Sequence, residues 1–358
     1  MYDIAVRTVD ELTDREWAAW RDIRAATPSL VSPFFAPEMV RALAAGRSAC
    51  RVAVLRRPSE IVGFFPFETN ALGMGRPVGG RLSDYHGPVL PVGETLDPVE
   101  LTRRCGLTTF AFEHVPAARA EFAPHAAPAR ESHNLDISQG FDAYRKERRA
   151  AGSDAADDLR TAAKKVDTRL ADARFEWHAD SDAVFEQLVA WKRQQYAATG
   201  FTDVLAAEWI RAALRRIART QTDDMSGVLS ALWGDGRLIA VHLSVQSGNV
   251  LHSWFPAYDA SLSKLAPGYA ILRHMIDAAR ERGIDRIEMG TGTEEYKLRM
   301  SNLRLPVLSG HVDTEPALTF ARETMQRTRQ WIRDSRFEAA ASRPIQAIRR
   351  FRESWSLR

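Results

Sequence analysis

The sequence predicts a mixed α/β protein of the α+β type, in which one kind of domain occurs twice along the chain. Two observations lead there. The chain has 358 residues, which is long for one compact domain and comfortable for two. Both halves also show the same order of predicted elements, in which helices come before a strand hairpin. We expect each half to hold a mixed, mainly antiparallel sheet flanked by helices, with a helical C-terminal tail after the second.

In the first half, two predicted helices come before a hairpin. Thr13 or Asp14 is placed to cap a helix that runs to about Arg24, because both side chains accept hydrogen bonds from free amides at a helix start. A second helix should cover 37–45. The apolar runs 51–55 and 61–67 then read as two strands joined by a turn.

The second half repeats this order and adds a helix and a strand. Gly234-Asp235-Gly236 separates the apolar runs 228–233 and 237–246, which is a strong hairpin signal. A third strand follows at 250–255. A helix should then run from Pro267 or Gly268 to a C-cap at Gly283, before a strand at 284–289. The repetition indicates an internal duplication. We expect a first domain at 1–150, a helical connector with a break near Gly152 at 151–170, a second domain at 171–313 and a basic helical tail at 314–358.

The tail carries the clearest charge imbalance of the chain. From Arg322 to Arg358 there are ten Arg against four acidic residues, whereas the whole chain has a net charge of only +3. A basic tail is typical of nucleic-acid or anionic-membrane contacts. The alternative is a solvated helix that packs on the body through apolar residues at helical spacing. Aromatic and basic residues do not alternate as in a nucleic-acid module, so we expect no nucleic-acid partner, with a weak membrane or synthase contact as the remaining alternative.

Targeting and metal signals are both missing from the sequence. The first seven residues lack the basic flank and apolar run of a signal peptide, and no stretch of about 18 apolar residues predicts a spanning helix. We therefore expect a cytoplasmic protein. Cys50 and Cys105 have no metal-ligand spacing, so we expect no metal.

The start of the helix at Pro267-Gly268 is a candidate anion site. A helix that opens directly after a turn leaves backbone N–H groups free at the positive end of its dipole, and these groups favour a pyrophosphate. Gly268 carries no side chain that would block a close approach. The alternative is an ordinary helix-opening turn, for which Pro-Gly is common.

Two histidines stand on neighbouring strands beside this helix. His242 alternates with the apolar residues of the strand 237–246, and His252 and Trp254 share a face of the next strand. If both polar faces line one cleft, these side chains converge, and a neutral His there can take a proton from an attacking group. The alternative is that each His is a hydrogen-bonded structural residue.

A glycine-rich turn at 290–292 leads into Tyr296 and Lys297. The Tyr296 hydroxyl can donate to a leaving thiolate, and the Lys297 ammonium can hold an anion or a developing oxyanion. A helix-capping turn followed by a solvated Lys is the alternative.

With these residues in view, the segment 175–300 resembles the GNAT-type acetyltransferases of the CelD/BcsL family, which are associated with cellulose and exopolysaccharide biosynthesis. The first half adds similar stretches, so that the resemblance covers about residues 10–310. The combination of motifs is specific, although no single motif is. The motifs that carry it are Trp191-Lys192, Gln195-Tyr196, Thr199-Gly200, His242, His252-Ser253-Trp254, Tyr258-Asp259, Pro267-Gly268, Gly290-Thr291-Gly292, Tyr296-Lys297, Ser32-Pro33-Phe34-Phe35 and Ser83-Asp84-Tyr85-His86-Gly87.

The resemblance implies two tandem GNAT-like domains, similar in architecture to the Fem-type peptidyltransferases. It also implies an acyl-CoA donor, such as acetyl-CoA, and direct transfer without a covalent acyl-enzyme. Glu288 departs from the family pattern, which has Asp before the Gly-x-Gly turn. The first half looks like a degenerate copy, because its candidate helix at 97–105 is short. We expect it to bind no CoA and to wall the acceptor side with Asp84, Tyr85 and His86, for which a plain turn is the alternative.

The leading hypothesis is an acyl-CoA-dependent N- or O-acetyltransferase that acts on a sugar, a saccharide precursor or a related small polar acceptor in exopolysaccharide biosynthesis. The alternatives are a Fem-type transferase that uses aminoacyl-tRNA and a non-catalytic partner of a polysaccharide synthase. The candidate catalytic residues are His242, Glu288, Tyr296 and Lys297. The candidate donor-binding residues are Ala266, Pro267, Gly268, Tyr269 and Ala270. The candidate acceptor-binding residues are Lys192, Gln195, Tyr196, His252, Trp254, Tyr258, Asp84 and Tyr85.

Overall fold

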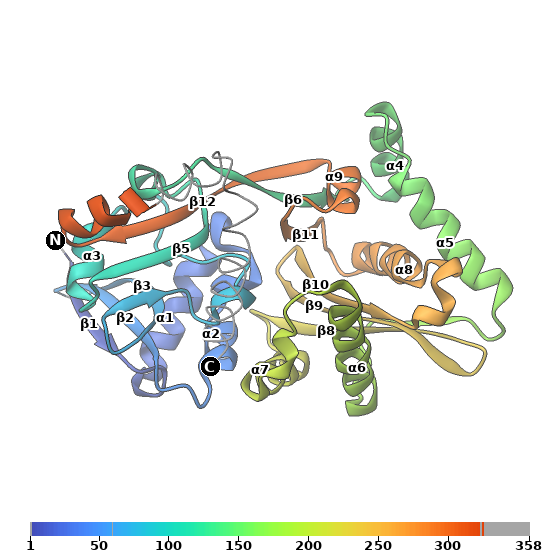
Figure 1. Ribbon diagram of the computed structural model, residues 1–358, viewed down its shortest axis with the longest axis horizontal. Coiled ribbons are helices and arrows are strands. Elements are labelled where there is room, and N and C mark those ends of the chain that lie inside the picture. Colours follow the sequence, from blue (N-terminus) through green and yellow to red (C-terminus); the bar gives the residue numbers. More distant parts are fainter. Residues whose placement is uncertain (1, 59, 323, 326–358) are drawn as a thin grey trace, which may run out of the picture.

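The computed structural model describes residues 2–58, 60–322 and 324–325. Within them, two lobes lie side by side and share one twelve-stranded sheet (Figure 1). The order of the strands is β1-β2-β3-β4-β5-β12-β6-β11-β10-β9-β8-β7. The mixed sheet with flanking helices confirms the predicted fold class.

The first half contributes the strands at one end of the sheet. Its N-terminal helices begin as the sequence predicts, with Thr13 accepting from the amide of Glu16 in a capping box. The elements are β1 (Asp3–Arg7), α1 (Asp14–Ala25), α2 (Pro37–Ala44), β2 (Cys50–Arg57), β3 (Glu60–Thr69), β4 (Met74–Arg76), α3 (Pro98–Arg104), β5 (Thr109–Pro116) and β6 (Arg130–Asp136), with short 3₁₀ turns η1 to η5 between them.

The second half repeats this order after two connecting helices, whose break falls at residues 151–154, where the sequence predicts one. Helices α6 and α7 lie on one face of its sheet, and α5 and α8 lie on the other (Figure 1). The elements are α4 (Phe141–Ala150), α5 (Ala155–Arg169), β7 (Arg174–Glu176), α6 (Asp182–Thr199), α7 (Glu208–Arg219), β8 (Ser226–Gly234), β9 (Arg237–Ser247), β10 (Val250–Tyr258), α8 (Pro267–Glu281), β11 (Arg286–Thr291), α9 (Glu295–Met300) and β12 (Leu303–Asp313), with η6 and η7 as short turns.

The two halves exchange a strand. β6, the last strand of the first half, pairs with β11 of the second. β12, the last strand of the second half, returns to pair with β5 of the first, and β6 and β12 also pair with each other. The sheet is therefore continuous between the lobes, and the limits proposed above for the domains remain predictions.

The described residues form three apolar clusters, and each draws on both halves, two of them through the exchanged strands β6 and β12. One cluster joins Trp20 and Phe64 of the first half to Phe185 and Leu243 of the second. The rings of Trp20 and Phe64 stack with centroids 4.7 Å apart, a contact of a kind that adds about 0.5–1.5 kcal/mol beyond burial. The interface between the halves is thus part of the core and fixes their relative position.

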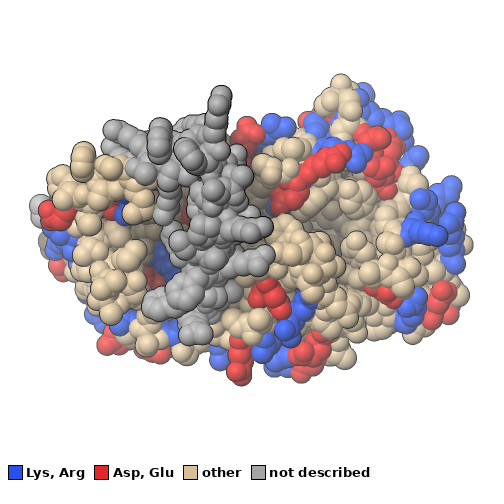
Figure 2. Space-filling model, in the orientation of Figure 1, with Lys and Arg blue, Asp and Glu red and all other residues tan. Residues whose placement is uncertain are grey.

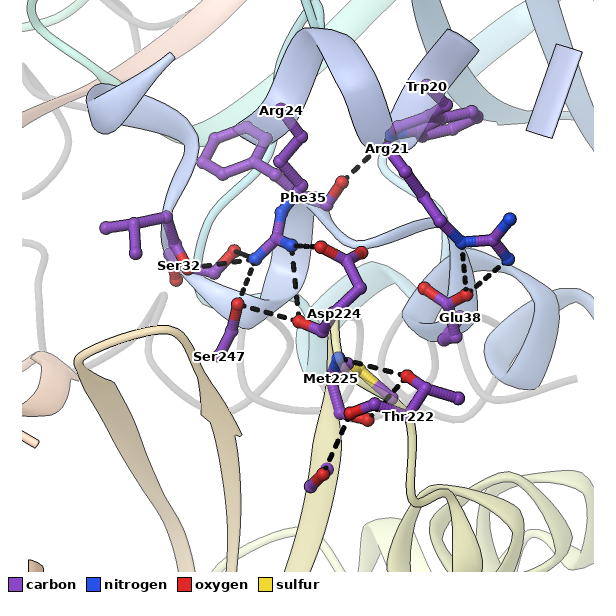
Figure 3. Close-up of polar contacts among 12 residues, drawn as sticks. Trp20, Arg21, Arg24, Ser32, Phe35, Glu38, Thr222, Asp224, Met225 and Ser247 are labelled. Carbon is purple, nitrogen blue, oxygen red and sulfur yellow. Dashed lines mark hydrogen bonds and ion pairs between the residues drawn. The ribbon is translucent and has the colours of Figure 1, made fainter. Parts of the chain in front are cut away.

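A buried arginine reinforces this interface. Arg24 of α1 pairs with Asp224, which precedes β8, and donates to Ser247 at the end of β9 (Figure 3). It also donates to the backbone carbonyl of Val31 at 2.9 Å. The planar guanidinium has five donors, so one side chain can bind both halves at once.

Three further predictions concern the C-terminal tail, membrane-spanning helices and the cysteines. Residues 316–322 are helical, but most of the predicted basic tail lies outside the described residues. No helix in the described part of the chain is long and apolar enough to cross a bilayer. Both cysteines are buried and free.

Candidate active site

The parallel strands β10 and β11 diverge in the middle of the second half. They pair only over Val250–His252 and Arg286–Glu288, although β10 continues to Tyr258. A register shift between Ser253 and Phe255 accompanies the divergence. β10 stays paired to β9 on its other side, so beyond His252 its edge toward β11 has backbone groups that no strand partner uses. This open edge leads into the turn before helix α8, which follows β10 in the chain.

The last residue pair before the divergence, His252 and Glu288, is the centre of a buried polar group. His252 Nδ1 lies 3.3 Å from Glu288 Oε2, and His252 Nε2 lies 2.9 Å from Asp84 Oδ2. The His252 side chain is fully buried, whereas the Asp84 side chain is 27% exposed. Asp84 comes from the first half, so this Asp84–His252–Glu288 centre needs both halves.

The charges in the centre follow from these contacts. Burial alone would lower the pKa of His252, but the hydrogen bonds to Asp84 and Glu288 outweigh it and raise that pKa to about 9. Burial would likewise raise the pKa of Asp84, but the hydrogen bond from His252 lowers it instead. At neutral pH an imidazolium is therefore held between two carboxylates, and Asp84 is the end that reaches solvent.

Ser32 and Arg286 complete the surroundings of Glu288. Ser32 Oγ donates to Glu288 Oε2 at 2.8 Å, and Arg286 donates to Oε1 at 3.2 Å. Arg24 holds the loop that carries Ser32 through the carbonyls of Val31 and Ser32 (Figure 3). Both oxygens of Glu288 are thus occupied, so Glu288 orients His252 and is not free to take a proton from a substrate.

The turn at Gly290-Thr291-Gly292 is held by side chains of the first half. Thr291 Oγ1 lies 2.9 Å from His114 Nε2, and His133 Nε2 lies 3.1 Å from the Gly292 carbonyl. Gly290 has a φ of +70°, and a side chain there would meet Asp84 Oδ2 at 2.9 Å. Only glycine fits this approach.

Sequence reasoning missed His114, His133 and the role of Ser32. His114 has a φ of +61°, a strained backbone for a residue other than glycine, and no sequence pattern marks such a residue. Ser32 belongs to a motif that carried the resemblance, which was the available signal. The contacts of all three cross between halves that are far apart in sequence.

Two lysines from helices bond to the diverging strands, Lys192 of α6 to β10 and Lys297 of α9 to β11. Lys192 Nζ donates to the Pro256 carbonyl of β10 at 3.1 Å and to Gln195 Oε1 at 3.0 Å. Lys297 Nζ donates to the Thr291 carbonyl of β11 at 2.7 Å. Burial, with a further contribution from the charge of Lys297, lowers the pKa of Lys192 to about 8. The divergence of the strands therefore places two cations at its sides.

Helix α8 follows β10 and starts with little capping of its own. Its N-cap is Ala266, which has a φ of +51° and supplies no side-chain hydrogen bond. The amides of Tyr269 and Ala270 both donate to the Ala266 carbonyl, and Pro267 has no N–H. The amide of Gly268 is the first-turn donor for which the described residues supply no acceptor. The helix start therefore offers fewer free donors than predicted. The ring of Tyr258 lies close to Gly268, because a Cβ atom there would come within 3.3 Å of it.

His242 does not join this centre, contrary to the prediction that both histidines converge. His252 pairs with Val245, which shares a face of β9 with Val241 and Leu243, whereas His242 alternates with these residues and points to the opposite face. Its Nε2 lies 2.9 Å from Ser253 Oγ. Burial, helped by the charge of Lys192, lowers the pKa of His242 to about 3, so it is neutral.

The remaining predicted residues divide between exposed and buried positions. Tyr258 and Tyr296 are 40% and 38% exposed, and burial of its hydroxyl raises the pKa of Tyr296. Tyr196 packs beside Lys192, with Nζ 5.5 Å from its ring, and Trp254 packs edge-on against Phe34. Tyr85 does not face an acceptor: it is buried, and its hydroxyl bonds to Ser132 at 2.6 Å. His86 is also buried, and its Nε2 accepts from the amide of Glu113, so the acceptor role predicted for these two residues is wrong.

No group of His, Cys, Asp and Glu side chains suited to a metal ion occurs among the described residues. The polar groups of the centre are instead bonded to one another, as the contacts above show.

A protein-family model and several solved structures resemble the chain. Residues 153–298 match the acetyltransferase (GNAT) domain family, which is less than half of the chain. No curated protein sequence matches. Residues 153–298 are thus similar to a GNAT acetyltransferase domain, whereas the CelD/BcsL type rests on the resemblance alone.

Among solved structures, FemX is similar over 89% of this chain and 99% of its own, with a TM-score of 0.59 and 10% identity. The L-PGS of Bacillus licheniformis is similar over 88% of this chain and 96% of its own, with a TM-score of 0.52 and 11% identity. A tandem GNAT protein from the clavulanic acid biosynthesis pathway covers 88% of this chain and 99% of its own, with a TM-score of 0.50 and 12% identity. At these identities the similarity shows the fold, which is that of tandem GNAT proteins.

Proposed function

We propose that the protein transfers an acetyl or another acyl group from an acyl-CoA to an amine or a hydroxyl of a sugar, a saccharide precursor or a related small polar acceptor. The transfer is direct, without a covalent acyl-enzyme. The observation that carries the proposal is the divergence of β10 from β11 beside the sparsely capped start of α8. This arrangement joins an open strand edge to an anion-binding helix end.

The donor would lie along these two features. The backbone groups of β10 beyond His252 that no strand pairs, apart from the Pro256 carbonyl bonded to Lys192, suit the amides of a pantetheine arm, which would add to the sheet edge as an extended peptide does. The Gly268 amide and the helix dipole favour the pyrophosphate, with the donor contacts formed by Ala266, Pro267, Gly268, Tyr269 and Ala270. Lys192 and Lys297 add positive charge near the thioester carbonyl, where negative charge develops.

The centre at Asp84 would take up the proton of the acceptor. As the acceptor nitrogen or oxygen attacks the thioester carbon, its proton passes to Asp84, whose carboxylate is the solvent-accessible base. His252 positions Asp84 and spreads its charge, and Glu288 orients His252. The C–S bond then breaks, and the protonated hydroxyl of Tyr296 can donate to the leaving thiolate.

Two observations bear on the nature of the acceptor. The CelD/BcsL resemblance favours exopolysaccharide biosynthesis, and an acyl-CoA donor fits a cytoplasmic enzyme. On the face shown in Figure 2, acidic and basic side chains are interspersed across both halves. A small acceptor suits such a surface better than a nucleic acid, which favours a continuous basic surface.

The test is a binding and turnover assay on the full chain. Acetyl-CoA at about 100-fold over its dissociation constant should stabilise the protein by about 2.7 kcal/mol, and thiol release should follow when amino sugars or neutral sugars are added. Charged tRNA serves as the alternative donor. No stabilisation by millimolar acetyl-CoA would contradict the proposal, and transfer from charged tRNA alone would assign the site to the Fem-type reaction.

A further inference from the structure

A cleft lies where the two connecting helices meet the last helix and strand of the second half. It has a volume of about 440 Å³, within the range of roughly 300–1,000 Å³ that small-molecule sites occupy. The break between α4 and α5 forms one wall, and the end of α9 with the start of β12 forms the other. Its polar lining is supplied by Arg148, Ser153, Arg299, Ser301, Asn302 and Arg304.

The charge of this lining is positive. The residues that line the cleft, all within the described part of the chain, include three arginines and no Asp or Glu. Arg299 pairs with Asp158 at 2.7 Å, and Arg304 pairs with Glu131 at 3.1 Å. Arg148 is half-buried, its Nη1 donates to a backbone carbonyl, and it forms no ion pair with a carboxylate of the described residues. Arg148 is therefore the cation in this lining whose charge the protein leaves uncompensated.

An anion suits this cleft better than a neutral ligand. A guanidinium has five donors in a planar fork that matches phosphate, and the backbone carbonyl uses Nη1 of Arg148. The neutral polar side chains already have partners. Ser153 Oγ donates to the Arg299 carbonyl at 2.8 Å, and Asn302 Nδ2 donates to Glu147 Oε2 at 2.7 Å. The hydrogen-bonding capacity left for a ligand thus lies mainly on charged donors.

The cleft lies next to the start of α8. Helices α8 and α9 both pack against α5 (Figure 1), and the pair between Arg299 and Asp158 ties α9 to α5. Tyr269 belongs to the first turn of α8. Burial raises the pKa of Tyr269, and the positive charge of Arg299 opposes that rise, so the two side chains are near each other. Arg299 therefore stands between the helix start and the cleft.

We infer that this cleft binds the 3′-phosphate of the CoA donor, with Arg148 as its main ligand and Arg304 as a second cation. The inference rests on the proposed function, which puts the pyrophosphate of CoA at the start of α8. From there the adenosine end passes Arg299 and carries its phosphomonoester into the cleft. This group has a charge of about −1.5 to −2 at neutral pH and competes with the exposed Glu131 carboxylate for Arg304. The protein therefore distinguishes CoA from dephospho-CoA, which lacks only this phosphate.

The test compares acetyl-CoA with acetyl-dephospho-CoA by calorimetry on the full chain. The ionic strength is kept constant, because salt screens exposed charges. The wild type should bind acetyl-CoA about 10- to 100-fold more tightly, since hydrogen bonds to charged groups are strong. Arg148→Met should remove most of this preference by weakening acetyl-CoA binding and should leave the Kd of the dephospho ligand unchanged. Arg304→Met should reduce the preference less, and it removes an exposed ion pair of a kind that contributes little to stability.

Arg149→Met is the matched control. Arg149 follows Arg148 on α4 and pairs with Asp157, but it does not line the cleft. The variant loses the same charge from the same helix, so its preference for acetyl-CoA should equal that of the wild type. R304M keeps the test decisive if R148M loses stability with its bond to the backbone.

The outcomes separate this inference from the proposed function. If the wild type binds acetyl-CoA and acetyl-dephospho-CoA equally, the inference is overturned and the proposed donor stands. A full preference retained in both R148M and R304M overturns it too, because the phosphate then lies elsewhere. If the wild type binds neither ligand, the proposed function is contradicted and the inference fails with it.

Discussion

The two halves of the protein begin corresponding helices in opposite ways. In the first half, α3 has seven residues, and the Asp97 carboxylate at its N-cap accepts from the amides of Val99 and Glu100. In the second half, α8 has fifteen residues, and its N-cap Ala266 offers no side-chain acceptor. The first half thus fills its helix start with its own carboxylate, whereas the second half leaves that position open to a bound anion.

The strands before these helices also differ, in their length and in how far they extend beyond their paired segment. β4 has three residues and pairs with β5 only at Met74 and Gly75. β10 has nine residues and continues beyond its pairing with β11. An open strand edge next to an uncapped helix thus occurs in the second half, while the first half supplies Asp84 to the shared centre. Under the proposed function, the second half would hold the donor and the first half would contribute Asp84 from outside.

The largest expected effect comes from breaking the contribution of the first half. Asp84→Asn keeps the shape of the side chain but removes its charge and its basicity, so acyl-transfer kcat should fall roughly 10²- to 10⁴-fold. Steady-state thiol release measures this. Asp203→Asn is the control, because the Asp203 side chain is 28% exposed and pairs with Arg193, similar in exposure to Asp84 but outside the centre. Equal kcat for the two variants would remove Asp84 from the mechanism.

The next largest effect should come from giving α8 the cap that α3 has. Ala266→Asp places a carboxylate at the helix start, where it would repel a pyrophosphate, so the Kd for acetyl-CoA should rise about 10- to 100-fold. The Tm should stay the same or rise, because the new side chain can cap the helix. Calorimetry and thermal unfolding separate the two effects. Unchanged affinity would place the pyrophosphate elsewhere.

A pH effect of intermediate size should report the charge of His252. Its folded pKa of about 9 lies above the ordinary value of about 6.5, so its contribution to stability is complete below pH 6.5 and is lost as the pH rises through 9. Taken alone, this contribution falls by on the order of 1 to 2 kcal/mol between pH 6.5 and 8. The lowered pKa values of the buried His242 and His86 act in the opposite sense over the lower part of this range, and that of Lys192 does so mainly above pH 8. The charge of His252 is therefore isolated by comparing the wild type with D84N, because both proteins share these other groups.

Urea unfolding at the two pH values measures this dependence, with D84N as the comparison. The variant lacks one carboxylate that raises the pKa of His252, so its stability should depend less on pH. An equal pH dependence in the wild type and D84N would contradict a protonated His252 paired with Asp84.

The smallest effect is expected at the helix start of the first half. Asp97→Ala removes two side-chain hydrogen bonds and should cost about 1 kcal/mol of stability, measured by urea unfolding. Acetyl-CoA affinity and kcat should stay at wild-type values. Loss of acetyl-CoA binding in this variant would show that both halves take part in holding the donor.

Local sequence signals predicted most of the fold. The Gly234-Asp235-Gly236 turn, the Pro267 helix start and the Gly283 C-cap act within a few residues, so their physical effect can be read along the chain. The short α3 was predicted for the same reason. The exchange of β6 and β12 was not, because strand pairing between distant segments leaves no local pattern.

The site was only partly predictable. The sequence singled out Glu288, His252 and Asp84 individually. Their contact depends on how the two halves pack, because Asp84 and His252 are 168 residues apart in sequence. The prediction that His242 and His252 lie on the same face of the sheet was wrong. Period-two alternation defines the two faces of one strand, but it does not say which of them matches a given face of the neighbouring strand. His114, with its left-handed backbone, had no sequence signal.

The most direct test of the difference between the halves is the stoichiometry of acetyl-CoA binding by calorimetry, compared among the wild type, A266D and D97A. We predict one acetyl-CoA per chain for the wild type and for D97A, and strongly weakened binding for A266D. Two acetyl-CoA molecules per chain, or binding that persists in A266D and is lost in D97A, would contradict the assignment of the donor cleft to the second half.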